Sequence, residues 1–183
     1  MQSLTKSIYR YRARTLYQKI ARYIRSNEKV LDMGGGSGYL GELISRKAKV
    51  TLLDTVDYNQ SHLPLLLFDG KRIQISDNSF DTTIIVAVLH HTLYPERLIA
   101  EAKRVSKRIV IVEDTYKTIL GLIFLDAWDW FWNKTSGISS FYNFRTPDGW
   151  KEIFRDLKLK LVHNAQITNS LGIYKINIFI LEK

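Results

Sequence analysis

Residues 29–43 read KVLDMGGGSGYLGEL, and this stretch is the strongest indication of the fold in the sequence. The apolar residues after Lys29 predict a short buried strand that ends at Asp32, and three glycines follow at 34–36. A helical spacing of apolar residues begins at about Gly38. A strand that breaks into glycines and re-forms as a helix suits a nucleotide-like ligand. Glycine lets the backbone approach a ligand closely, and the helix N-terminus presents free N–H groups.

The glycines fit two cofactor motifs. The pattern Gly36-x-Gly38-x-x-Gly41 matches the dinucleotide fingerprint. The pattern Gly34-x-Gly36-x-Gly38 is similar to the loop of methyltransferases that use S-adenosylmethionine (SAM). Gly36 lies late for a dinucleotide loop, and Asp32 would repel a pyrophosphate but would suit a sulfonium or an ammonium group. The loop by itself favours SAM and leaves a dinucleotide open.

The composition indicates one domain over residues 1–183. The hydrophobic fraction of 45% is sufficient for a buried core. The absence of cysteine excludes a cysteine nucleophile and a cysteine-based zinc site. Only one pair among the four histidines, His90 and His91, is close in sequence, so we expect no dedicated metal site.

No secretory signal and no apolar run of about 20 residues is seen, so we expect a soluble, cytoplasmic protein. The positive charge gathers at one end: residues 1–29 hold eight basic residues and one acidic residue, Glu28. Residues 4–25 have the apolar spacing of a helix, which makes 1–28 a basic N-terminal helix. We favour a helix that covers the sheet and exposes its basic face. Contact with an anionic membrane surface or with nucleic acid stays open, and so does the oligomeric state.

Strands and helices alternate along the chain, which predicts an α/β fold with a mostly parallel sheet. Pro95 and Pro147 open two of the helices, the second with Thr146 as its N-cap. At most two helical turns fit between 55 and 63. The last two strands are expected to form an antiparallel hairpin. The prediction is a Rossmann-like, doubly wound, seven-stranded sheet with strands at about 29–32, 49–54, 65–68, 82–89, 108–113, 160–168 and 174–181.

Residues 116–143 interrupt this alternation with an aromatic segment. Trp128 and Trp132 lie in an apolar run that Asp126 and Asp129 break. We expect a helical hairpin or cap that encloses an acceptor, with the aromatic side chains as pocket walls. A dimer contact and a membrane-facing surface are the alternatives, because three tryptophans in such a run would form an unusual apolar patch on a plain surface.

A carboxylate, Asp54, is expected at the carboxyl end of the second strand, where parallel sheets bind ligands. It can accept both hydroxyls of a ribose. Because SAM and NAD share the ribose, Asp54 does not separate the two cofactors.

Residues 69–105 read DGKRIQISDNSFDTTIIVAVLHHTLYPERLIAEAKRV. An aspartate after strand three, a DNSFD turn at 77–81, Leu-His-His at 89–91 and a Glu-x-x-Arg-Val helix at 101–105 occur in this order. With the glycine loop upstream, this stretch resembles the class I SAM-dependent methyltransferases of the UbiE type. The resemblance covers about residues 29–114.

The resemblance implies a role for each matching position. The loop would hold the methionine part and sugar of SAM, Asp32 would orient the loop or the ammonium, and Asp54 would bind the ribose. The full set of cofactor residues is Asp32, Gly34, Gly35, Gly36, Asp54, Thr55, Asp69, Gly70, Val86 and Ala87. Asp69 would accept a hydrogen bond from the adenine amino group, and the product would be S-adenosylhomocysteine (SAH).

The acceptor side would be formed by His90, His91, Asp126, Trp128 and Trp132. His91 is the candidate general base, and a capping or hydrogen-bonded histidine is the simpler interpretation. We expect methyl transfer to a small-molecule or lipid-like acceptor under the aromatic cap. A nucleic-acid or protein methyltransferase guided by the basic helix, and a SAM-binding protein without turnover, are the alternatives.

Overall fold

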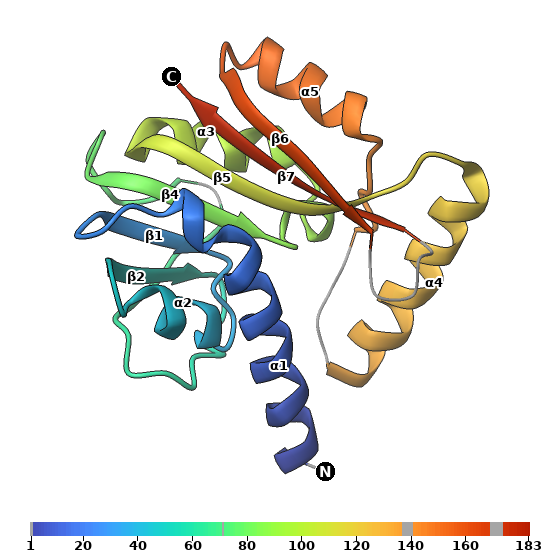
Figure 1. Cartoon of the computed structure of the whole chain (residues 1–183), viewed down its shortest axis with the longest axis horizontal. Coiled ribbons are helices and arrows are strands. Elements are labelled where there is room, and N and C mark those ends of the chain that lie inside the picture. The colour runs from blue at the N-terminus through green and yellow to red at the C-terminus, as the bar shows by residue number, and fades with distance from the viewer. Residues whose placement is uncertain (1, 71, 137–140, 169–173) are drawn as a thin grey trace. The chain divides into compact units, whose positions relative to one another are not determined.

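The computed structural model describes residues 2–70, 72–136, 141–168 and 174–183. Figure 1 labels most of the helices and strands. Their bounds are α1 Gln2–Ile20, η1 Ala21–Tyr23, β1 Lys29–Met33, α2 Tyr39–Ile44, β2 Lys49–Asp54, β3 Leu65–Leu67, β4 Phe80–Val86, η2 Leu89–His91, α3 Pro95–Val105, β5 Ser106–Thr115, α4 Ile119–Ser136, α5 Pro147–Asp156, β6 Lys160–Thr168 and β7 Lys175–Glu182.

Within the described residues, seven strands form one sheet in the order β3-β2-β1-β4-β5-β7-β6. β1, β2 and β3 pair in parallel. β7 runs antiparallel to β5 on one side and to β6 on the other. The predicted α/β, Rossmann-like sheet with a closing antiparallel hairpin is therefore confirmed.

The chain divides into two compact units. The first comprises Met1–Ile84 and Arg104–Lys107, and the second comprises Ile85–Lys103 and Arg108–Lys183. In the first unit, β1 and β2 form the core, with Val30, Leu31 and Leu52 fully buried. Such strands are buried on both faces and are therefore almost continuously apolar.

The N-terminal helix is present, but the predicted apolar stripe is only partly buried. Ile20 and Ile24 are buried, whereas Ile8 and Tyr11 are 41% and 73% exposed. α1 packs on α2, which begins just after the glycine loop (Figure 1). Among the described side chains of the predicted stripe, those in its second half contribute to the core of this unit.

In the second unit, the buried residues of β5 and β7 form the core. α5 begins as predicted: the Thr146 hydroxyl accepts the N–H of Gly149 at 3.1 Å, and Pro147 occupies the first turn. Trp150 and Phe154 on this helix are buried, and the helix packs beside β6 (Figure 1).

One local prediction is wrong, the end of the fourth strand. Residues 55–63 contain no helix, which agrees with the predicted limit of two helical turns. β4 ends at Val86 rather than 89, because Ala87 adopts a left-handed φ of 54° and η2 follows. The described part of 116–143 contains one helix, α4, and no second helix that would make a hairpin.

Candidate active site

The glycine loop is tied to the end of β2 by one carboxylate. The Gly36 N–H donates to Asp54 Oδ2 at 3.0 Å, and the Thr55 N–H donates to Asp54 Oδ1 at 2.7 Å. Gly36 has φ of +52°, and no atom lies within 4 Å of the position where a Cβ would stand. The half-buried loop therefore leaves open space at Gly36, which is what a closely approaching ligand requires.

Asp32 lies in the buried part of β1, one residue before the strand ends at Met33. It is 3% exposed, and its Oδ2 has no hydrogen-bond partner among the described residues. Burial, together with the nearby charge of Asp54, raises the pKa of Asp32 to about 7. An open, buried carboxylate oxygen is suited to receive a cation or an N–H donor. The ammonium of SAM fits this position, whereas a pyrophosphate would add negative charge beside two carboxylates.

The ends of β2 and β3 lie together. The Phe68 N–H donates to the Asp54 carbonyl at 3.1 Å, and a Cβ on Gly70 would stand 3.8 Å from Thr55 Cγ2. Asp69 is exposed at the same edge. The residues that the resemblance assigned to the ribose and the adenine thus share one edge of the first unit.

Val86 and Ala87 belong to the second unit. Val86 is the last residue of β4 and Ala87 follows it, and the Ala87 N–H donates to the Val112 carbonyl at 2.8 Å. This bond fixes the bend at Ala87 against β5.

Glu113 on β5 organises the turn that follows. Its Oε1 accepts the N–H groups of Val88 and Leu89 at 2.8 and 2.7 Å, and its Oε2 lies 2.6 Å from His90 Nδ1. A carboxylate only accepts hydrogen bonds, so Nδ1 carries the proton and Nε2 of a neutral His90 keeps a lone pair. Glu113 was not among the site residues predicted from the sequence. An acidic residue that directly continues the apolar run of a buried strand was the available signal.

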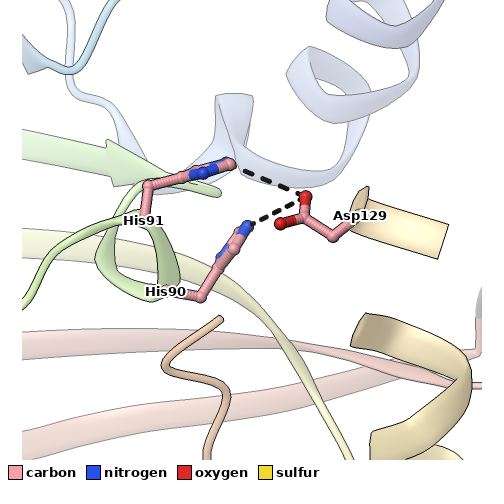
Figure 2. A group of neighbouring side chains, drawn as sticks. All are labelled: His90, His91 and Asp129. Carbon is pink, nitrogen blue, oxygen red and sulfur yellow. Dashed lines mark ion pairs between the residues drawn. The ribbon is translucent and has the colours of Figure 1, made fainter. Parts of the chain in front are cut away.

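Both histidines of η2 point toward one carboxylate oxygen (Figure 2). His90 Nε2 lies 3.8 Å and His91 Nε2 lies 4.0 Å from Asp129 Oδ1. The Phe144 ring stacks on His90 at a centroid distance of 4.4 Å. Burial lowers the pKa of His90, but the charge and hydrogen bond of Glu113 outweigh burial, so this pKa is raised overall.

α4 carries Asp129. Apart from the buried Leu125, this helix covers several polar side chains and exposes large apolar ones. Its polar residues Asp126, Asp129 and Asn133 are buried or half-buried. Its outward face is apolar, with exposed Ile119, Leu120, Ile123, Trp130 and Phe131. No helix among the described residues is long and apolar enough to cross a membrane.

The proposed acceptor residues on α4 differ in position. Asp126 Oδ1 is buried without a hydrogen-bond partner among the described residues, and burial, with the charge of Asp129, raises the pKa of Asp126. Trp128 is 38% exposed and stacks on Phe124. Trp132 lies on α4, but its side chain is outside the described residues.

The sequence profile of the methyltransferase domain family matches residues 6–164. The chain belongs to this family. It is similar to the ubiquinone/menaquinone biosynthesis C-methyltransferase UbiE of Cupriavidus metallidurans, with 29% identity over 108 residues that cover 49% of this chain and 44% of that protein. The matched segment thus spans about half the length of this relative.

Two solved structures share the fold. One is the 1,6-didemethyltoxoflavin-N1-methyltransferase of Burkholderia thailandensis with bound 1,6-didemethyltoxoflavin and SAH, with a TM-score of 0.66 and 13% identity over 93% of this chain and 76% of that chain. The other is the [4+2]-cyclase SpnF, with a TM-score of 0.72 and 14% identity over 92% and 80%. The family match confirms the prediction that the chain is a class I SAM-dependent methyltransferase domain with SAM as its cofactor.

Proposed function

We propose that this domain transfers the methyl group of SAM to a small, lipid-like acceptor. The observation that carries the acceptor class is helix α4, which turns the Asp129 carboxylate toward His90 and His91 and exposes large apolar side chains. An apolar surface on the element that bears these polar groups suits an acceptor with an apolar tail and a polar reacting end. The name of the UbiE relatives adds a finer proposal, methylation of a ring carbon of a quinone-type compound.

The cofactor supplies an already activated methyl group, so the protein mainly has to hold and orient. Asp32, Asp54, Thr55, Asp69, Gly70 and the glycines 34–36 are the proposed cofactor residues of the first unit, and Val86 and Ala87 are those of the second. A carbon or hydroxyl acceptor must also lose a proton. His91 is the proposed base, because its ring is 22% exposed and Asp129 can stabilise the imidazolium that forms.

The N-terminal helix supports a second candidate function. Arg12 and Arg14 on α1 are exposed, and an exposed basic helix can bind nucleic acid or an anionic surface. Methylation of RNA or protein would follow from such binding, and a membrane contact would instead bring a lipid-like acceptor close.

The test is a methyl-transfer assay with three acceptors: an isoprenoid hydroquinone in detergent micelles, a short RNA and a basic peptide. SAH formation and the mass of the product are measured, and the Asp54→Ala variant serves as the cofactor-site control. We expect product only from the hydroquinone. Product from the RNA or the peptide with none from the hydroquinone would refute the proposal.

A further inference from the structure

Three side chains of the second unit converge without hydrogen bonding to one another. The separations of 3.8 and 4.0 Å between the imidazole Nε2 atoms and Asp129 Oδ1 are too long for hydrogen bonds. One ligand atom from each of His90, His91 and Asp129 nevertheless lies within 4.8 Å of the others. The three atoms therefore face a shared space (Figure 2).

This spacing is close to that of a metal centre. Zinc–nitrogen and zinc–oxygen bonds of about 2.1 Å in a tetrahedron place ligand atoms about 3.4 Å apart. The distances between the three ligand atoms, which are at most 4.8 Å, would have to shorten by about 1 Å to reach this value.

Two of the three side chains are oriented by a partner on their other side. Glu113 Oε2 holds His90 Nδ1 at 2.6 Å, which directs Nε2 toward Asp129. Asn133 Nδ2 donates to Asp129 Oδ2 at 2.7 Å, which leaves Oδ1 toward the histidines. Carboxylates that bind the second nitrogen of a histidine are the usual outer partners of metal-bound imidazole.

We propose that His90, His91 and Asp129 bind a divalent transition-metal ion such as Zn²⁺. Imidazole and carboxylate ligands suit Zn²⁺ and its first-row neighbours, whereas Mg²⁺ prefers oxygen ligands. Three protein ligands leave a coordination position for water or for an oxygen atom of an acceptor.

This site does not depend on methyl transfer, because a metal ion alone can test it. It does compete with one role given above: a metal-bound His91 cannot also act as the general base. The sequence predicted no metal site because nothing in it relates Asp129 to the two histidines.

The experiment is a titration of the full chain, freed of metal by a chelator, with Zn²⁺ by calorimetry and with Co²⁺ by visible absorption. His91→Gln and Asp129→Asn remove one ligand each, and His62→Gln removes an exposed histidine of the first unit as the matched control. Circular dichroism checks that each variant is folded.

We expect one ion per chain, displacement of Co²⁺ by Zn²⁺ but not by Mg²⁺, and a rise of Tm with Zn²⁺. His91→Gln and Asp129→Asn should weaken Zn²⁺ binding by about 100-fold or more, Glu113→Gln by about 10- to 100-fold, and His62→Gln not at all. If Asp129→Asn does not fold, His91→Gln alone decides. No stoichiometric uptake by the wild type, or unchanged uptake by the ligand variants that fold, would overturn the proposal.

Discussion

Replacing Asp32 by asparagine should stabilise the cofactor-free protein at neutral and alkaline pH. Asparagine has nearly the same shape as aspartate but carries no charge. The wild-type carboxyl is buried and has one oxygen without a hydrogen-bond partner among the described residues. The substitution therefore removes a charge that the folded chain holds in a poorly solvated place.

The magnitude follows from the pKa of Asp32, which burial and the charge of Asp54 together raise from 3.8 to about 7. Between these two pH values the folded chain holds a proton that the unfolded chain has released, so the free energy of unfolding falls as pH rises and levels off above about pH 7. The free energy of unfolding falls by about 1.4 kcal/mol for each pH unit of this interval, so the total loss is on the order of 4 kcal/mol. The asparagine variant lacks this contribution.

Urea unfolding followed by tryptophan fluorescence at pH 5, 6, 7 and 8 measures the effect. We compare the unfolding free energies of Asp32→Asn and the wild type at each pH. In their difference, the contributions of groups that titrate equally in both proteins drop out. It should increase by about 3 kcal/mol in favour of the variant from pH 5 to pH 8. A difference that stays constant over this range would refute the assignment of a raised pKa to Asp32.

Further predictions concern binding and turnover. SAH affinity of the wild type should rise from pH 5.5 to 7.5, because the ammonium binds the ionised Asp32, and calorimetry of Asp32→Asn should show weak, pH-independent binding. Asp54→Ala should weaken SAH binding by about 1.5–3 kcal/mol by calorimetry, and Asp69→Ala by less, since Asp69 is exposed; equal affinity of all three proteins would refute these roles. Trp128→Ala should lower turnover in the methyl-transfer assay and leave SAH affinity unchanged, whereas normal turnover with lost liposome binding or dimerisation would favour a membrane or dimer contact.

Local sequence signals predicted the fold well. The sheet followed from runs of β-branched and apolar residues bounded by polar strand ends, and Thr146 with Pro147 marked the start of α5 to the residue. The glycine loop and Asp54 lie where the loop motif and the strand end placed them. These features depend on neighbours in sequence, which is why the sequence alone could indicate them.

Features that depend on distant residues were missed. Ala87 ends β4 because its left-handed backbone is held by Val112 and the next turn is bound by Glu113, and neither contact has a local signal. The approach of Asp129 to His90 joins residues from separate elements. The sequence left an outward apolar face of α4 open as an alternative to pocket walls, since an apolar run does not tell which side faces solvent.

Calorimetry can test whether the loop and the carboxylates of the first unit bind SAM rather than a dinucleotide. The wild-type chain is titrated with SAH and, in a separate run, with NAD at pH 7.5. We expect one SAH per chain and no heat of binding from NAD. Binding of NAD with none of SAH would show that the site is a dinucleotide site.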